Sequence, residues 1–482
     1  MVYILNNVFK FNITLLVFLL MLMPATFPMN QIDFDPLMDV IVTVKINEVR
    51  FLEDNNLEED TTFYIVVTIN NEIFKSKIWN DTRYLYGINW TVSLNVPDDN
   101  EYVSIILQLW DCSNGTDKLC DINPNKDYNQ AEIIYSICSG HWSGDDYIGD
   151  LSGYGRLNGC DDGSIYENER DCELCFDIYQ NDFDNDNIPY YYEENVYLTN
   201  PEFNDVGSDC DNDKIPIEWE HRWGYDPNLW DDHVNLDPDL DGIQNYEEFL
   251  TSDWDSDPFR KDLFIEIDEM QESPDGLSSK VPNNSKELVR NVYCRRNILL
   301  HIDDGCMGGG GETIPFDRVT GGVDLFFIYY RYFLHNNFHN WRRGVFRYCM
   351  SIYHHVTASG IAYVGEMPFL YWHAKGTNTY QISSTSIQQI SEYNYKSLDF
   401  IYACIILHET CHTMGIDLLF PLGCDNKRTM YPWRISYWIF QNYKSVMNYR
   451  YVWEILDYSD GSHGKGDYND WDNLDLTFFC LK

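Results

Sequence analysis

Five consecutive residues near the C-terminal end, His408-Glu409-Thr410-Cys411-His412, have the types and spacing of a metal-activated hydrolase. Histidines four residues apart share one face of a helix, so both imidazoles can bind one Zn²⁺ at ~2.0–2.1 Å. Glu409 stands beside them, where it can take a proton from a zinc-activated water and return it to a leaving group. We therefore predict His408 and His412 as zinc ligands and Glu409 as general base and acid.

Two further features extend this motif. It continues as HExxHxxG through Gly415, and the sequence SVMNY occupies 445–449. Together they resemble the metzincin metallopeptidases, which have an extended zinc motif and a Met-turn beneath the metal. The resemblance implies an α+β catalytic domain over 258–482 that acts on protein or peptide substrates. It also implies that Met447 floors the zinc site and that Tyr449 contacts the metal or the oxyanion.

The chain departs from the metzincin pattern at the third zinc ligand. That pattern places His or Asp three residues after the glycine, where this chain has Leu418. Asp417 comes one position early, whereas Asp425 lies further on and has room to return from a turn. We expect Asp425 or Asp417 to complete the site, and we favour Asp425 because Asp417 would require the helix end to be remodelled. The sequence also leaves open a different ligand, such as His463, or the lack of an intact site.

An acidic block precedes this domain. Residues 181–260 contain 23 Asp and Glu against three basic residues. Within the block, three segments that begin 27 and 28 residues apart carry Asp at positions 1, 3 and 5 and Glu at position 12. A tight loop turns such oxygen ligands toward one centre, which suits Ca²⁺, and the carboxylates would repel one another without a cation. The predicted calcium ligands are Asp182, Asp184, Asp186, Glu193, Asp209, Asp211, Asp213, Glu220, Asp237, Asp239, Asp241 and Glu248.

These segments differ from EF-hands, because the apolar residue stands at position 7 and a proline follows it in two of them (Pro189 and Pro216). The stretch 215–227 resembles thrombospondin type 3 calcium repeats. The resemblance covers 181–257 and implies chained calcium sites with little regular secondary structure, forming a spacer that orders only when calcium is bound. Additional candidate ligands between neighbouring loops are Asp205, Asp231, Asp232 and Asp257.

The zinc motif needs elements to position it. Residues 398–414 are predicted to form an apolar helix that Gly415 ends. Upstream, 263–267 and 297–302 are predicted strands, and 285–295 a helix with Ser285 as its N-cap. Strand, helix and strand in this order argue for an α/β or α+β unit. By analogy with metzincins, 359–364 is expected to form the edge strand that flanks the substrate.

The N-terminal part has a different character. Short β-branched runs separated by polar turns predict a β-sandwich over 36–178, and Leu107-Gln108-Leu109-Trp110-Asp111 is loosely similar to C2 domains. We interpret it as an accessory module, with a glycan or a membrane surface as possible ligand. The apolar run 13–23 predicts a signal peptide over 1–28, or an uncleaved anchor, and hence a secreted or cell-surface protein. Fourteen cysteines in an exported chain predict disulfide bonds.

The composition fits this organisation. A formal net charge of −44 argues against nucleic acid as a partner, because phosphates would be repelled. The sequence thus predicts a multidomain, secreted zinc endopeptidase with an N-terminal β-sandwich, a calcium-binding spacer and a metzincin-like catalytic domain. The alternative is a calcium-dependent cell-surface or adhesion protein with an inactive peptidase-like domain, and the leucine at position 418 is its main support.

Overall fold

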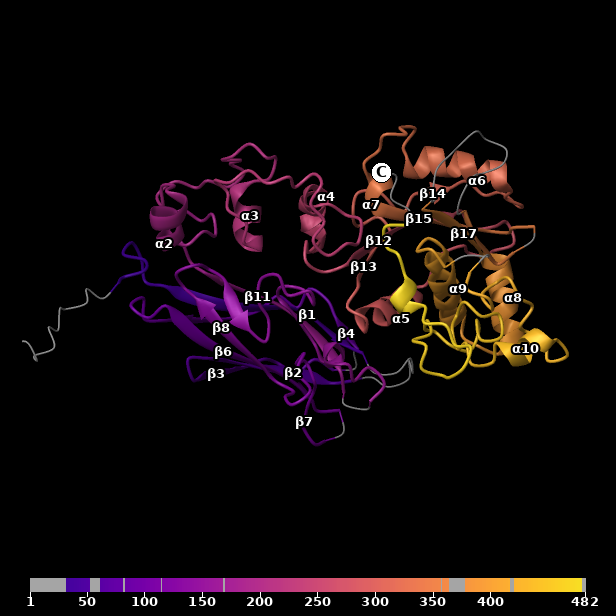
Figure 1. The fold of residues 1–482 in the computed structure, drawn as a ribbon, viewed down its shortest axis with the longest axis horizontal. Helices are drawn as coiled ribbons and strands as arrows, with labels where there is room; N and C mark the ends of the chain where they lie inside the picture. Colours follow the sequence, from indigo (N-terminus) through magenta and orange to yellow (C-terminus); the bar gives the residue numbers. More distant parts are fainter. Residues whose placement is uncertain are drawn as a thin grey trace, which may run out of the picture.

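The computed structural model places three units in chain order: a β-sandwich, an acidic loop-rich segment and a mixed helix-and-sheet unit (Figure 1). The predicted signal peptide and Asp417 lie outside the described residues. The structure describes residues 32–52, 61–80, 83–113, 115–167, 170–356, 358–363, 378–416 and 420–478.

Two antiparallel sheets form the sandwich, in the region where the sequence predicted one. The first has the order β10-β11-β1-β4, with β5 also paired to β1, and the second has the order β3-β2-β6-β8-β9, with β7 paired to β6. Residues along β6 alternate between buried and more exposed positions, and the buried faces of both sheets share one apolar core. The elements are β1 (Ile41–Phe51), β2 (Phe63–Ile69), β3 (Glu72–Lys75), β4 (Tyr84–Leu85), β5 (Trp90–Asn95), β6 (Tyr102–Asp111), β7 (Lys118–Leu119), β8 (Ala131–Ser136), β9 (Trp142–Gly144), β10 (Arg156–Asn158), η1 (Gly159–Asp162) and β11 (Cys172–Gln180).

The acidic segment contains more helix than the sequence predicted. A short helix follows each of the three loops, and the glutamate at loop position 12 lies in it. The helical turn brings this carboxylate back toward the loop that precedes it, as for Glu220 and Asp213. The elements are α2 (Tyr190–Tyr192), η2 (Glu193–Tyr197), α3 (Ile217–Trp223), α4 (Asn245–Thr251) and η3 (Ser252–Trp254).

The C-terminal unit is built on a mixed sheet with the order β13-β12-β15-β17-β16, and β14 pairs with β12. Strands β13, β12, β15 and β17 run parallel to one another, whereas β16 is antiparallel to β17 at one end of the sheet. The sequence predicted β12, β13 and β16 to within a few residues. The strands are β12 (Asp262–Met270), β13 (Leu299–Asp303), β14 (Thr313–Ile314), β15 (Phe346–Ile352), β16 (Gly360–Tyr363) and β17 (Thr379–Ser383).

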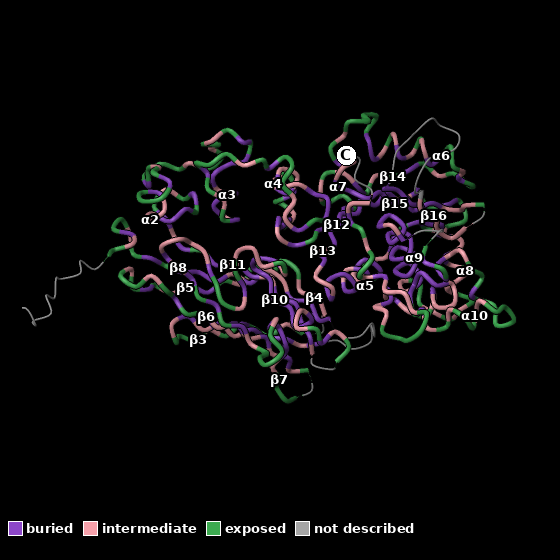
Figure 2. The backbone as a smooth tube through the Cα atoms, in the orientation of Figure 1, coloured by how far each residue is buried: buried purple, intermediate pink, exposed green. Residues whose placement is uncertain are grey.

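Helix α9, which carries the zinc motif, lies in the core of this unit and is buried from Ile401 to its last residue (Figure 2). Helix α5 begins at Asn283 after Pro282, so the prediction of Ser285 as its N-cap is wrong; the Ser285 hydroxyl donates to the Asp399 carbonyl instead, at 2.9 Å. None of the described helices combines the length and the apolar character that crossing a membrane requires. The helices are α5 (Asn283–Cys294), α6 (Gly322–Ile328), η4 (Tyr329–Phe333), α7 (Arg342–Val345), α8 (Ser384–Asn394), α9 (Leu398–His412), α10 (Ile435–Ile439) and η5 (Trp471–Asn473).

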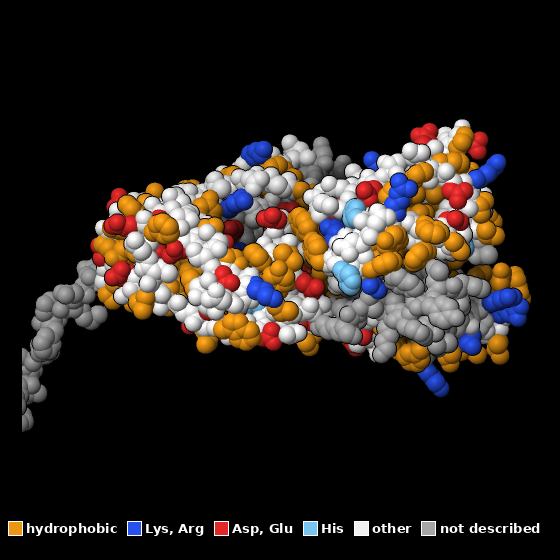
Figure 3. All heavy atoms as spheres, turned by 90° about the horizontal axis from the view of Figure 1, so that it is seen from above, with side chains coloured by type: hydrophobic (Ala, Val, Ile, Leu, Met, Phe, Trp, Pro, Cys, Tyr) orange, Lys and Arg blue, Asp and Glu red, His pale blue; other side chains and the backbone are white. Residues whose placement is uncertain are grey.

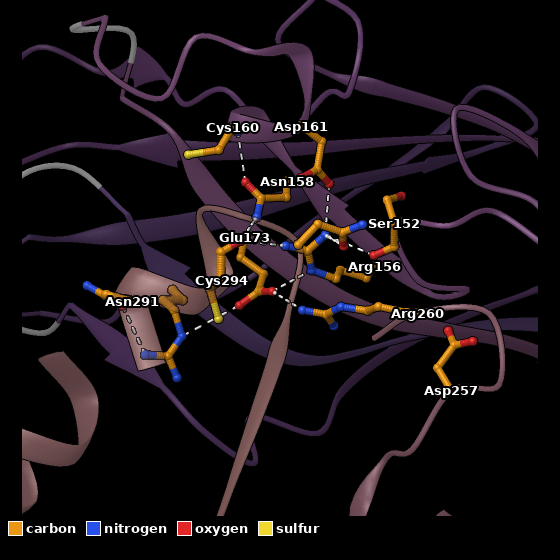
Figure 4. A network of polar contacts seen from close by, with 12 residues as sticks. Ser152, Arg156, Asn158, Cys160, Asp161, Glu173, Asp257, Arg260, Asn291 and Cys294 are labelled. Carbon is orange, nitrogen blue, oxygen red and sulfur yellow. Dashed lines mark hydrogen bonds and ion pairs between the residues drawn. The ribbon is translucent and has the colours of Figure 1, made fainter. Parts of the chain in front are cut away.

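A buried polar network joins the sandwich to the C-terminal unit (Figure 4). Glu173 on β11 accepts a hydrogen bond from Arg156 Nε at 2.5 Å, and it also pairs with Arg50 and Arg260 at 3.5 and 3.4 Å. Arg156 Nη2 in turn donates to the Cys294 carbonyl at the end of α5, at 3.0 Å. Arginines from both units therefore converge on one carboxylate.

The predicted disulfide bonds are not confirmed where the structure describes the thiols. Free thiols stand at Cys112, Cys120, Cys138, Cys160, Cys175, Cys210, Cys294, Cys306, Cys349, Cys404 and Cys411.

Candidate functional site

Both histidines of the motif are held in one tautomer by backbone carbonyls. His408 Nδ1 lies 2.9 Å from the Val446 carbonyl and His412 Nδ1 lies 2.6 Å from the Ile416 carbonyl. Because each Nδ1–H can donate to a carbonyl, the Nε2 of the neutral imidazole would have its lone pair available for a metal. Backbone partners of this kind orient the histidine ligands of metal sites.

The carboxylate of Asp425 meets both Nε2 atoms. His408 Nε2 lies 3.2 Å from Asp425 Oδ1, and His412 Nε2 lies 3.1 Å from Asp425 Oδ2. Two ligands each ~2.0–2.1 Å from a tetrahedral Zn²⁺ are separated by roughly 3.3 Å. The three side chains thus have the chemistry and the spacing of a zinc site with two histidines and one aspartate.

A compact turn after α9 directs Asp425 toward the helix. Gly423 N donates to Asn426 Oδ1 at 3.0 Å, and Asn426 Nδ2 donates to the Pro421 carbonyl at 2.8 Å. Gly423 has a φ of +107°, and a Cβ there would lie 2.7 Å from the ring of Phe440. Glycine therefore allows the sharp return that brings a residue thirteen positions beyond His412 back to it.

Glu409 is 4% exposed and lies against β16. The Ala362 amide of that strand donates to its carboxylate, while Oε2 finds no hydrogen-bond partner among the described residues. Gly360 makes room for this side chain, because a Cβ at that position would overlap with the Glu409 carboxylate. Burial raises the pKa of Glu409, and the two neighbouring imidazoles oppose that rise.

The segment predicted as a Met-turn lies beside His408, whose Nδ1 meets the Val446 carbonyl. Met447 is fully buried in the same core as α9, and its amide donates to Ser445 Oγ at 3.0 Å. The ring of Tyr449 stacks on that of His408 with centroids 6.1 Å apart, and its hydroxyl is hydrogen-bonded to Asp425. Burial raises the pKa of Tyr449, and the Asp425 and Glu409 charges raise it further, so the phenol stays protonated.

The charges of this group reinforce one another. Burial opposes ionisation of His408 and of Asp425, but their mutual attraction outweighs it. This attraction raises the pKa of His408 and lowers the pKa of Asp425. His463, the other candidate ligand, belongs to a separate group with Asp460 and Asp467.

The three acidic loops share one backbone conformation. At loop positions 4 and 6, residues with positive φ occur in every loop: Asn185, Asn187, Asn212, Lys214, Leu240 and Gly242. In all three loops the aspartate at position 5 accepts the amide of the isoleucine at position 7, and this isoleucine is buried. The repeat detected in the sequence is therefore a repeat of structure.

Carboxylates are crowded in each loop. Burial and the neighbouring aspartates raise the pKa of Glu193 and of Glu220 to about 8 and that of Asp239 to about 10. Both carboxylate oxygens of Glu220 are buried without a hydrogen-bond partner among the described residues. A bound divalent cation would compensate this repulsion with the oxygen ligands that Ca²⁺ prefers.

The sequence analysis did not identify one residue that lies against the second loop. His233 is fully buried, its Nε2 lies 3.2 Å from Asp213 Oδ2, and it forms a metal-competent group with Asp213 and Glu220. It follows the loop by about twenty residues, so no local spacing marks it.

The additional acids predicted between loops behave differently from one another. The amides of Asp205 and Asp231 donate to the loop residues Asp186 and Asp213 at 3.3 and 3.4 Å, which places both next to the loops. The Asp232 carboxylate accepts the side-chain amide of Asn235. The Asp257 carboxylate accepts the amide of Tyr154 in the sandwich and the amide of Phe259.

Comparisons with known proteins match part of the chain. No protein-family model matches the chain, and no curated protein matches its sequence. Human GIVD cytosolic phospholipase A2 in complex with methyl gamma-linolenyl fluorophosphonate is similar over 29% of this chain and 17% of its own length, with 16% identity and a TM-score of 0.17. A C2 domain is similar over 29% and 97%, with 11% identity and a TM-score of 0.19. A C2 domain of plant extended synaptotagmin 1 is similar over 29% and 95%, with 12% identity and a TM-score of 0.17.

The chain is multidomain, and its β-sheet-rich N-terminal region is the β-sandwich described above. The chain spans about a sixth of the length of the phospholipase that it matches.

Proposed function

We propose that this protein is a zinc-dependent endopeptidase of metzincin type with a calcium-stabilised spacer. The observation that carries the proposal is the convergence of His408 Nε2, His412 Nε2 and the Asp425 carboxylate at 3.1–3.2 Å beside a buried glutamate. Asp425 supports the proposal as a candidate third ligand in place of the leucine at position 418.

The residues around this group suit peptide hydrolysis. Bound zinc would lower the pKa of a water from 15.7 toward about 7 and polarise a peptide carbonyl. Glu409 Oε2, buried and without a hydrogen-bond partner among the described residues, is placed to accept the proton of that water and deliver it to the leaving amine. The protonated hydroxyl of Tyr449, which is hydrogen-bonded to Asp425 in this structure, would donate a hydrogen bond to the oxyanion by turning away from that carboxylate.

The position of strand β16 supports a peptide substrate. It is the last strand of the sheet within the described part of the chain, and its Ala362 amide already contacts Glu409. An extended peptide that pairs with the outer edge of β16 would lie beside the catalytic group. Protein or peptide substrates therefore fit this site.

The test separates chemistry from metal binding. Glu409→Ala should abolish cleavage of an unfolded protein such as casein while zinc stays near one per chain, whereas Asp425→Ala should lose the zinc. Glu392→Ala, an exposed acid on α8, is the control and should change neither. Cleavage that survives in Glu409→Ala refutes the mechanism. A wild-type protein that binds calcium but no zinc would favour the adhesion-type alternative.

A further inference from the structure

Large apolar side chains are exposed to solvent around α10. Trp433, Ile435 and Trp438 are 77%, 78% and 58% exposed. Monomeric soluble proteins rarely expose a contiguous group of large apolar side chains without a binding function. We call this group the α10 surface. Its exposed apolar members are Phe420, Leu422, Met430, Tyr431, Trp433, Ile435, Trp438 and Ile439.

The same stretch of the chain carries a positive net charge, in contrast to the negative net charge of the whole chain. From 426 to 453 there are five basic residues and no acidic one, although acids outnumber bases 77 to 33 in the whole chain. Lys427, Arg428, Arg434 and Lys444 are exposed among the apolar side chains. Asp425, the nearest acid before this stretch, is paired with His408 and His412. Screening at physiological salt acts over about 8 Å, so carboxylates further away do not cancel the local positive charge.

The α10 surface is held in shape by its own contacts. Trp438 Nε1 donates to the Pro432 carbonyl at 3.0 Å, and Ser436 Oγ donates to the Arg428 carbonyl at 3.1 Å. The rings of Tyr431 and Trp433 stack with centroids 4.8 Å apart. The exposed rings are therefore fixed before any partner binds, which lowers the entropic cost of binding.

Its position leaves it accessible. Helix α10 lies at the end of the molecule remote from the sandwich, where the backbone is exposed (Figures 1 and 2). A view from another side shows hydrophobic and basic side chains next to each other at this end (Figure 3). The surface is thus free to meet an extended partner without hindrance from the sandwich.

We propose that the α10 surface docks the protein on a membrane leaflet that contains anionic phospholipid. Tryptophan and tyrosine favour the headgroup level of a bilayer, where their rings are half in apolar surroundings. Neighbouring lysine and arginine side chains are attracted to anionic headgroups. The combination of exposed indoles with clustered bases, in a chain that otherwise carries a large negative charge, fits an anionic bilayer.

Cosedimentation of the full chain with vesicles tests this proposal. The protein should bind vesicles in which phosphatidylserine replaces roughly a third of the phosphatidylcholine, bind pure phosphatidylcholine more weakly, and be released by salt. A Trp433→Ser, Trp438→Ser double variant and a Lys427→Glu, Arg434→Glu double variant should each lower the partition coefficient about tenfold. The charge variant should lose only the component that depends on phosphatidylserine.

Matched controls replace side chains of the same kind elsewhere. Tyr393→Ser on α8 removes an exposed aromatic ring, and Lys118→Glu on β7 reverses an exposed charge. Neither should change vesicle binding. Wild-type binding by both double variants would overturn the proposal, because another surface would then hold the membrane. Loss of peptide cleavage without loss of vesicle binding would also overturn it and assign the surface to substrate recognition.

Discussion

Glu173 offers a direct test of how the sandwich is joined to the rest of the chain. Its buried carboxylate faces Arg156, Arg260 and Arg50, and Arg156 continues to the end of α5 (Figure 4). The substitution Glu173→Gln keeps the shape of the side chain but removes its charge. The buried guanidinium groups would then lose their shared counter-charge, although Arg156 keeps Asp161 and Arg50 keeps Glu287, and removing one partner is the costly way to break a buried ion pair.

The expected loss follows from the pKa of this carboxyl group. Burial opposes ionisation, but the three arginines, Arg156 foremost, lower the pKa of Glu173 from 4.5 to about 2. This difference corresponds to about 3 kcal/mol. Because the folded pKa is depressed, the contribution is complete above pH 4.5 and disappears as the pH falls through about 2. Loss of a partner in a buried pair costs ~3–5 kcal/mol in other proteins, which agrees.

Hydrogen exchange measures this loss locally. At neutral pH the amides of β11 should lose roughly a hundredfold in protection in Glu173→Gln, and the difference from wild type should shrink between pH 4.5 and about 2. Asp177→Asn is the control, because its ion pair with Arg222 at 2.8 Å is about one-third exposed on both sides and should contribute less than about 1 kcal/mol. Equal protection in Glu173→Gln and wild type would refute the electrostatic account of this junction.

Two other predictions concern the site and the spacer. Gly360→Ala should displace the Glu409 carboxylate and lower kcat/KM at least about a hundredfold while zinc content stays unchanged. The control is Gly322→Ala, whose added methyl group meets nothing within 4 Å and should have no effect. Normal activity of Gly360→Ala would contradict the placement of Glu409. Chelation of calcium should open 181–257 to added protease, because the crowded carboxylates then repel one another, and cleavage of this segment in the presence of excess calcium is the comparison. Equal protection with and without calcium would show that the loops hold no structural cation.

Short-range patterns in the sequence were sufficient for part of this description. His408, Glu409 and His412 lie within two helical turns, so the geometry of α9 alone places both imidazoles on one face. The acids of each loop fall within twelve residues, and the closed loop brings them together wherever the segment folds. Alternation of apolar residues likewise indicated the strands of the sandwich, because one face of each strand must be buried.

The elements that the sequence misjudged depend on contacts with distant residues. Ser285 has the composition of an N-cap, yet its hydroxyl bonds to a carbonyl more than one hundred positions away. The sequence also failed to predict the helices of the acidic spacer, which are too short to show a helical period and form because each packs beside its loop. His233 joins the second loop from outside it, for which no spacing rule exists.

The sequence by itself thus determined two imidazoles, one neighbouring carboxylate and three acidic loops, because these groups are adjacent along the chain. Only the tertiary structure brings Asp425 to the two imidazoles, since a turn at Gly423 and the packing of Phe440 carry it back to α9. The space that Gly360 leaves for Glu409 also comes from a separate strand. Site residues that lie within one helix can be predicted from local sequence, whereas a site residue supplied by a returning loop depends on the whole fold.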